Sequence, residues 1–166
     1  APTGMVIDAA SGLIQWTPNN TQTGANIVIV FATDSSGLTA SQSFSVTVAN
    51  VNDAPSISST PNTAATEGLL YQYAVIAIDP DVGDNLTYSL DTAPAGMTIN
   101  ASGVALWTPS EAQVGIQSVA VRVTDSGGLS DTQTYTVTVA NQPNPPVFTS
   151  SPIAAASEGS NYLYDA

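Results

Sequence analysis

Three carboxylates lie close together in AIDPDVGDNLTYSL, the stretch at residues 77–90. Asp79, Asp81 and Asp84 fall within six positions, directly after an apolar run. The chain has thirteen acidic residues and only one basic residue, Arg122, to offset them. Calcium takes about six to eight oxygen ligands, mostly from carboxylates and carbonyls. The stretch therefore predicts either a solvated, turn-forming loop or a site for a cation that comes from outside.

The composition of the whole chain excludes several kinds of chemistry. Its 166 residues carry a formal net charge of −12 and include no His, Cys or Lys. Without these residues it cannot form a Ser-His triad, a thiolate nucleophile, a His-ligated metal site or a Lys Schiff base. The negative charge repels phosphate backbones, so we expect no nucleic-acid partner. No apolar run reaches the roughly 18 residues of a membrane span, so we expect no membrane insertion in this segment.

The chain repeats itself at an offset of 91 residues, which is strong evidence for tandem domains. Three pairs of segments match: 2–18 with 94–109 (with one extra residue in the first copy), 33–38 with 124–129, and 48–55 with 139–146. Five single residues also recur: Pro61, Glu67, Gly68, Tyr71 and Tyr73 return as Pro152, Glu158, Gly159, Tyr162 and Tyr164.

This offset predicts three parts. Residues 1–50 would be the C-terminal part of a first repeat, residues 51–141 a complete repeat, and residues 142–166 the N-terminal part of a third. We expect the chain to belong to a longer array, because half a repeat would expose its core. NQPNPP at 141–146 is Pro-rich and predicts a stiff, extended linker.

Apolar residues alternate with a period of two in the complete repeat, which is typical of half-buried strands. SVAVRVTD and TQTYTVTVA are the clearest examples, with Val119, Val121, Val123, Tyr135, Val137 and Val139 predicted to face inward. Further strands are expected at 56–60, 70–78 and 85–90, with a hairpin around ASG at 101–103 and one helical turn capped by Ser110. About seven short strands in about 90 residues predict an all-β, immunoglobulin-like Greek-key β-sandwich.

On these segments the chain resembles cadherin-like repeats. AIDPDVGDNLTYSL resembles their Asp-x-Asp segment, VNDAP the end of their linker, and VTDSGGLSDTQTYTVTVANQPNPP their last two strands and linker. PAGMTINASGVALWTP resembles the He_PIG-like and dystroglycan-type cadherin-like repeats of large bacterial surface adhesins. The resemblance implies an extracellular, cell-surface location.

The resemblance also implies a calcium site at the junction before the complete repeat. An Asp-x-Asp pair in extended chain points both side chains to one side. The implied ligands are Asn52, Asp53, Asp79, Asp81 and Asp125, with Asn85 where the family often has a carbonyl donor. Glu67 matches the family's early Glu, which serves the next junction together with a second carboxylate, here Glu111.

Two departures from the family pattern weaken the predicted site. The counterpart of Glu111 at the first junction is Asn20, and NQPNPP lacks the Asp of VNDAP. We therefore expect one or two calcium ions at the first junction and a weaker second junction. The loop is not an EF-hand, because its fifth residue is Gly83 and its twelfth is Leu90 rather than Glu.

The function these features favour is a non-enzymatic structural or adhesive repeat, with calcium rigidifying the junction between repeats. Its partners would be neighbouring repeats of the same chain and a homophilic, protein or polysaccharide ligand. A carbohydrate-binding module could use Trp16 and Trp107, although Trp within a strand is more often core. A glycosidase would need two carboxylates across a cleft, whereas these lie beside a linker. Residues 142–166 could also complete another copy and build fibres.

Overall fold

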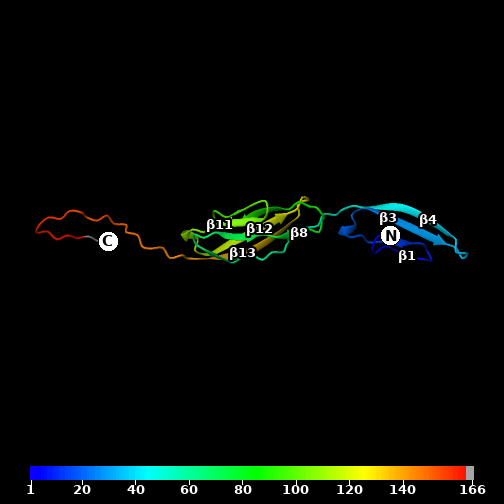
Figure 1. The fold of residues 1–166 in the computed structure, drawn as a ribbon, viewed down its shortest axis with the longest axis horizontal. Coiled ribbons are helices and arrows are strands. Elements are labelled where there is room, and N and C mark those ends of the chain that lie inside the picture. The colour runs from blue at the N-terminus through cyan, green and yellow to red at the C-terminus, as the bar shows by residue number, and fades with distance from the viewer. Residues whose placement is uncertain (164–166) are drawn as a thin grey trace.

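The computed structural model describes residues 1–163, which form an elongated molecule (Figure 1). A central β-sandwich at 56–140 follows an N-terminal unit at 1–48, with a linker at 49–55 between them. Residues 142–163 contain no strand or helix and run out as an extended stretch. Tyr164 and the other last residues of the predicted third repeat lie outside the described residues. Within residues 1–163, no helix is long and apolar enough to cross a bilayer.

The N-terminal unit consists of two separate antiparallel strand pairs. Its elements are β1 (Val6–Ile7), β2 (Ile14–Gln15), the 3-10 turn η1 (Asn20–Gln22), β3 (Gly24–Thr33) and β4 (Thr39–Val48). β1 pairs with β2, and β3 pairs with β4 along its whole length.

The central sandwich has a four-stranded sheet in the order β6-β13-β12-β9 and a three-stranded sheet in the order β10-β11-β7, with a short β5–β8 pair. Its elements are β5 (Ser56–Ile57), β6 (Ala64–Thr66), β7 (Tyr71–Ala74), β8 (Ala77–Ile78), β9 (Thr87–Thr92), β10 (Thr98–Ile99), β11 (Val104–Trp107), η2 (Glu111–Gln113), β12 (Gly115–Thr124) and β13 (Ser130–Ala140). Neighbouring strands are antiparallel except β6 and β13, which run parallel. The predicted all-β sandwich is confirmed.

The core of the sandwich is filled by the residues that the period-two pattern selected. Val119, Val121 and Val123 on β12 are fully buried, as are Val137 and Val139 on β13. Tyr135 is only half-buried, but it packs against this core. The helical turn expected after Ser110 is also present, as η2.

Aromatic side chains pack both within the three-stranded sheet and between the two sheets. Trp107 is 2% exposed and meets Tyr71 edge to face, with ring centroids 6.2 Å apart. Tyr73 meets Tyr135 in the same way at 5.7 Å. Burial raises the pKa of Tyr135, so its phenol stays neutral. Trp107 is therefore a core residue, as the strand pattern favoured.

Two details of the fold differ from the prediction. The single strand expected at 70–78 is divided into β7 and β8, because the chain changes partners between them. The Val75 amide donates to Gly103 O on the β11 side at 2.9 Å, whereas Ile76 O accepts from Ser58 N on the β5 side. The short strand β6 was not predicted at all, since its Ala-Ala-Thr sequence has no β-branched alternation.

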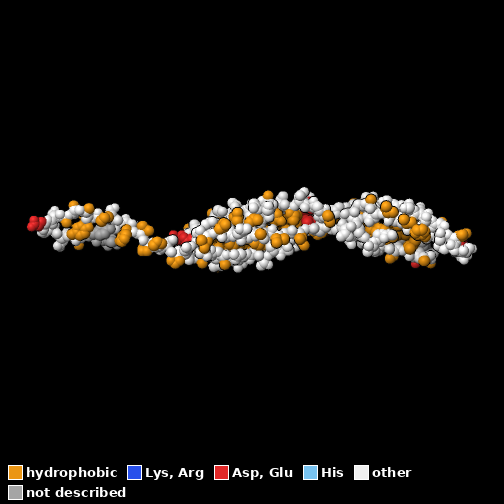
Figure 2. Space-filling model, in the orientation of Figure 1, with side chains coloured by type: hydrophobic (Ala, Val, Ile, Leu, Met, Phe, Trp, Pro, Cys, Tyr) orange, Lys and Arg blue, Asp and Glu red, His pale blue; other side chains and the backbone are white. Residues whose placement is uncertain are grey.

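The N-terminal unit leaves much apolar surface exposed. Val28 is buried, but the alternate residues of β3 point to its other face and are largely exposed: Ile27, Ile29 and Phe31. Figure 2 shows apolar side chains spread over this unit and over the C-terminal stretch. At the equivalent positions β12 carries Ser118, Ala120 and Arg122. The two copies therefore share Val at two positions of this strand, Val28 and Val30 matching Val119 and Val121, but differ on its other face.

Candidate cation site

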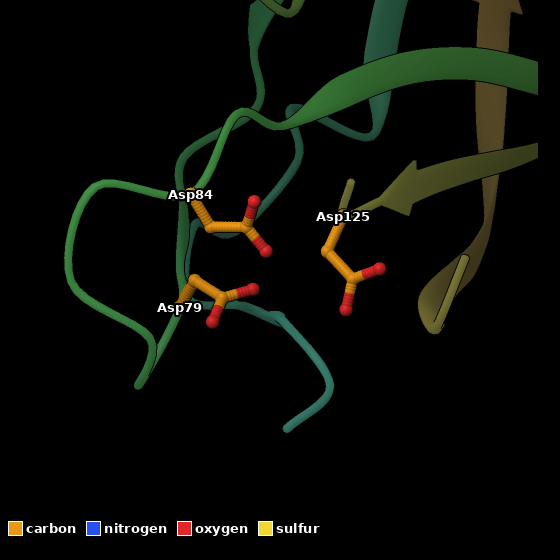
Figure 3. Close-up of side chains that lie close together, drawn as sticks. All are labelled: Asp79, Asp84 and Asp125. Carbon is orange, nitrogen blue, oxygen red and sulfur yellow. The ribbon is translucent and has the colours of Figure 1, made fainter. Parts of the chain in front are cut away.

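Three acidic side chains from two segments converge at the end of the central sandwich that faces the linker. Asp79 and Asp84 lie in the loop between β8 and β9, and Asp125 follows β12 directly. Figure 3 shows the three carboxylates turned toward one another across the gap between these loops. One oxygen from each lies within 4.8 Å of one from each of the others. The site is thus composed of hard oxygen donors only, which suits calcium or magnesium.

Asp81 adds a buried carboxylate beside this cluster. Its side chain is 7% exposed, and its Oδ2 accepts from the Asp53 backbone amide at 2.8 Å. Its Oδ1 is buried and has no hydrogen-bond partner among the described residues, and the same holds for Asp79 Oδ2. A buried carboxylate oxygen without a partner is costly. These two oxygens are therefore free to bind a cation.

Asp84 belongs to the cluster, although the resemblance did not assign it a ligand role. The Ser126 hydroxyl donates to Asp84 Oδ1, and this hydrogen bond lowers the pKa of Asp84 below its ordinary value. The Asp84 backbone amide also donates to Asp81 O at 3.2 Å. The Gly before Asp84 in DPDVGD is the sequence signal for this, because Gly allows a sharp bend. In the structure Gly83 has a φ of 87° and turns the loop back on itself.

The linker closes one side of the site through Asn52. Its Nδ2 donates to Asp125 Oδ2 at 2.8 Å, while Asp125 Oδ1 accepts from the Leu129 amide at 2.8 Å. A small open pocket of about 190 Å³ lies between this linker and the 81–84 loop. Asp125 is 5% exposed, so both of its oxygens are held in a defined place.

Gly127 is the residue that lets Asn52 approach the Asp125 turn. A Cβ built at this glycine would lie 2.5 Å from the Asn52 amide group, which is too close for any real contact. The first copy of the turn, TDSSGL, has Ser36 at the equivalent position. Gly127 is therefore required by the packing of the linker and not by its own backbone conformation.

We expect Gly127→Ala to displace Asn52 and to break its bond to Asp125, while the sandwich stays folded. The amide side-chain signals of Asn52 in an NMR spectrum should shift, and its exchange with water should increase. Ser36→Ala is the matched control and should leave those signals in place. Unchanged Asn52 signals in Gly127→Ala would contradict this role.

The structure does not bring all the predicted ligands together. Asn85 is exposed, and its backbone amide donates to Asp84 Oδ1 at 2.9 Å, so its backbone lies next to the cluster. Asp53 turns its carboxylate toward Asn20 of the N-terminal unit, at 2.6 Å, and only its backbone amide reaches Asp81. Glu67 lies at the opposite end of the sandwich, where it accepts from the Gln142 amide at 3.4 Å.

No basic side chain neutralises the cluster. Arg122 is the only Lys or Arg of the chain, and it forms an ion pair with Asp91 at 2.6 Å. That hydrogen-bonded pair lowers the pKa of Asp91 and occupies the guanidinium. The carboxylates of the candidate site are thus left without an internal counter-ion.

The sheets and their connections define an immunoglobulin-like sandwich. A family described as "Putative Ig domain" matches residues 1–49 and 54–140, and the chain belongs to this family. The comparison with curated proteins gave no match. The resemblance to cadherin-like repeats is confirmed at the level of the fold by the solved structures.

Three solved structures illustrate that likeness. Domains 1–5 of protocadherin gamma B2 match 87% of this chain and 32% of theirs, at 18% identity and a TM-score of 0.64. Domains 3–6 of the same protein match 83% of this chain and 39% of theirs, at 24% identity and a TM-score of 0.55. Human protocadherin-24 domains 1–2 match 86% of this chain and 80% of theirs, at 17% identity and a TM-score of 0.57. The chain thus spans less than half of the two gamma B2 structures.

Proposed function

We propose that this chain is a non-enzymatic, calcium-binding structural or adhesive segment of a larger extracellular surface protein. In this proposal residues 1–50, 51–141 and 142–166 belong to successive repeats. Calcium held by Asp79, Asp81, Asp84 and Asp125 would stiffen the junction before the complete repeat. Asn52 and the Asp53 backbone would hold the linker against this site, while Glu67 would serve the following junction.

The observation that carries the proposal is the buried, unpaired Oδ1 of Asp81 beside three converging carboxylates. An acidic loop in solvent needs no cation, but a carboxylate that is more than nine-tenths buried with one oxygen unpaired is stabilised by one. The net charge of −12 and the single, already paired Arg122 leave an external cation as the available partner. The oxygen-only donor set favours calcium over transition metals.

Calorimetric titration of calcium into the full chain tests this proposal. We expect binding with a Kd of about 10⁻⁴ to 10⁻³ M, the range of extracellular calcium modules. Asp125→Asn should weaken it by about tenfold or more, because one unit charge next to the ion is lost. Asp34→Asn is the matched control, since Asp34 holds the equivalent position in the first TDSSGL turn and bonds only to its own loop amides.

Two outcomes of this titration would decide whether the site binds calcium. Heat that is reduced in Asp125→Asn and retained in Asp34→Asn would support the site. No heat at millimolar calcium would mean that the Asp residues are solvated turn formers, and the stiffening role would then be abandoned.

The alternative of a carbohydrate-binding module receives little support from the central sandwich. Trp107, the residue that could have stacked on a sugar, is 2% exposed and lies in the core. A homophilic or protein partner is compatible with the proposed adhesive role. The protocadherin gamma B7 structure that also matches the chain is described as a cis-dimer, which is a property of that protein.

A further inference from the structure

We infer that Asn20 joins the N-terminal unit directly to the linker through Asp53, which gives this junction one contact that does not depend on a cation. Asn20 Nδ2 donates to Asp53 Oδ2 at 2.6 Å. A carboxylate can only accept hydrogen bonds, so the amide nitrogen must be the atom that faces it. A bond to a charged acceptor is about twice as strong as one between neutral groups.

The turn that presents Asn20 is held rigidly. Asn20 is the first residue of η1, and Asn19 caps this turn by accepting from the Thr21 amide at 3.1 Å. Gln22 Oε1 accepts from the Asn19 amide at 3.1 Å, and Gln22 Nε2 donates to Thr3 O at 2.9 Å. The backbone of Asn20 is thereby fixed to the rest of the N-terminal unit.

Asp53 is held from the other side by the central sandwich. Its backbone amide donates to the buried Oδ2 of Asp81 at 2.8 Å. Pro55, two residues later, is buried, which limits the freedom of the chain between them. Asp53 thus connects the two parts of the chain: its side chain binds the N-terminal unit, and its backbone binds Asp81 in the loop between β8 and β9.

The repeat supplies an internal comparison for the identity of residue 20. The turn η2 is built in the same way: Gln113 Oε1 accepts from the Ser110 amide at 3.0 Å, and Gln113 Nε2 donates to Ala95 O at 3.0 Å. Its first residue is Glu111, a carboxylate at the position equivalent to Asn20. At the first junction a carboxylate there would face Asp53 and repel it. The Asn amide converts that repulsion into a hydrogen bond.

Asn20 is therefore a positioning residue that sets how far the junction depends on a cation. With an amide the two parts of the chain stay joined when cation is absent. With a carboxylate they would separate until a cation bridged Asp53 and residue 20. The first statement holds whether or not calcium binds, and only the second rests on the proposed calcium site.

The test measures the spread of distances between the two parts of the full chain. The chain has no Cys, so Ser45→Cys on β4 and Thr134→Cys on β13 can carry a spin-label pair without background. In chelator we expect a narrow distribution for the parent, a broader one for Asn20→Ala and the broadest for Asn20→Asp. Glu111→Gln, at the equivalent turn of the far end, should match the parent.

Calcium addition separates this inference from the proposed function. We expect calcium to narrow the Asn20→Asp distribution, and to bind that variant about thirtyfold more tightly, as expected for one added unit charge about 4 Å from a divalent ion in water. If calcium changes nothing, the calcium proposal fails, while the comparison in chelator still stands. Equal widths for the parent, Asn20→Ala and Asn20→Asp in chelator would overturn the inference about Asn20.

Discussion

Asp81→Asn should abolish the calcium response of the central sandwich and yet leave it at least as stable as the parent in chelator. The variant keeps an oxygen that can accept from the Asp53 amide, now at 2.8 Å from Asp81 Oδ2. It loses one negative charge in the same loop as Asp79 and Asp84. Relief of like-charge repulsion stabilises the cation-free state by about 1 kcal/mol.

The parent should behave in the opposite way when calcium is added. A ligand that binds only the folded state stabilises it by about 2.7 kcal/mol at a concentration of 100 Kd. Thermal unfolding followed by circular dichroism should therefore show that Asp81→Asn is at least as stable as the parent in chelator, and that the parent is the more stable of the two in calcium. Asp8→Asn removes one charge in the N-terminal unit, at a residue bonded to Ser11, and should behave like the parent in both conditions.

A fall in stability of Asp81→Asn in chelator, together with a retained calcium response, would contradict this expectation. It would mean that the charge of Asp81 is stabilised by the fold itself. The unpaired Oδ1 would then have a partner other than a cation.

Trp107→Ala should destabilise the central sandwich more than any other single change considered. Removal of a buried Trp costs about 3–5 kcal/mol, because the apolar contact is lost and a cavity remains. The indole is 2% exposed and packs against Tyr71 at a centroid distance of 6.2 Å. A loss of this size is a large part of the roughly 5–15 kcal/mol that stabilises a typical domain.

Hydrogen exchange by mass spectrometry gives the readout, since it separates the two parts of the chain. The amides of β12 and β13 should exchange much faster in Trp107→Ala, and those of β3 and β4 should not change. Trp16→Ala is the matched control: Trp16 is at the equivalent repeat position but is only half-buried, with its indole donating to Thr3 O at 3.2 Å. It should leave β12 and β13 protected. Unchanged exchange in Trp107→Ala would place this residue outside the core.

Much of the fold could be predicted because local sequence patterns determine it. The period of two selected the buried valines of β12 and β13, since alternate side chains of a strand face opposite sides. The ASG turn predicted the β10–β11 hairpin, and Ser110 predicted η2. The repeat at 91 residues also identified Trp107 as a residue of a recurring structural position. The strand pattern and the two turns each depend on neighbours within a few residues, whereas the repeat depends on comparing the two copies.

Only part of the candidate site could be predicted from the local sequence. DPDVGD predicted a group of carboxylates by its composition, and in the structure this loop follows β8. Which of its members converge depends on the path of the loop. Asp84, rather than Asp53, completes the cluster with Asp79 and Asp125, because Gly83 bends the loop and Asp53 is turned away toward Asn20.

The sequence by itself determined most of the strands, the repeat and the excess of negative charge. Only the tertiary structure decided that 70–78 divides between two partners, that β6 runs parallel to β13, and that Asp81 is buried with an unpaired oxygen. The physical reason is separation along the chain. Asn20 and Asp53 lie 33 residues apart, and Asn52 and Asp125 lie 73 apart. Periodicity sets which way a side chain faces, but the packing of whole sheets sets what it meets there.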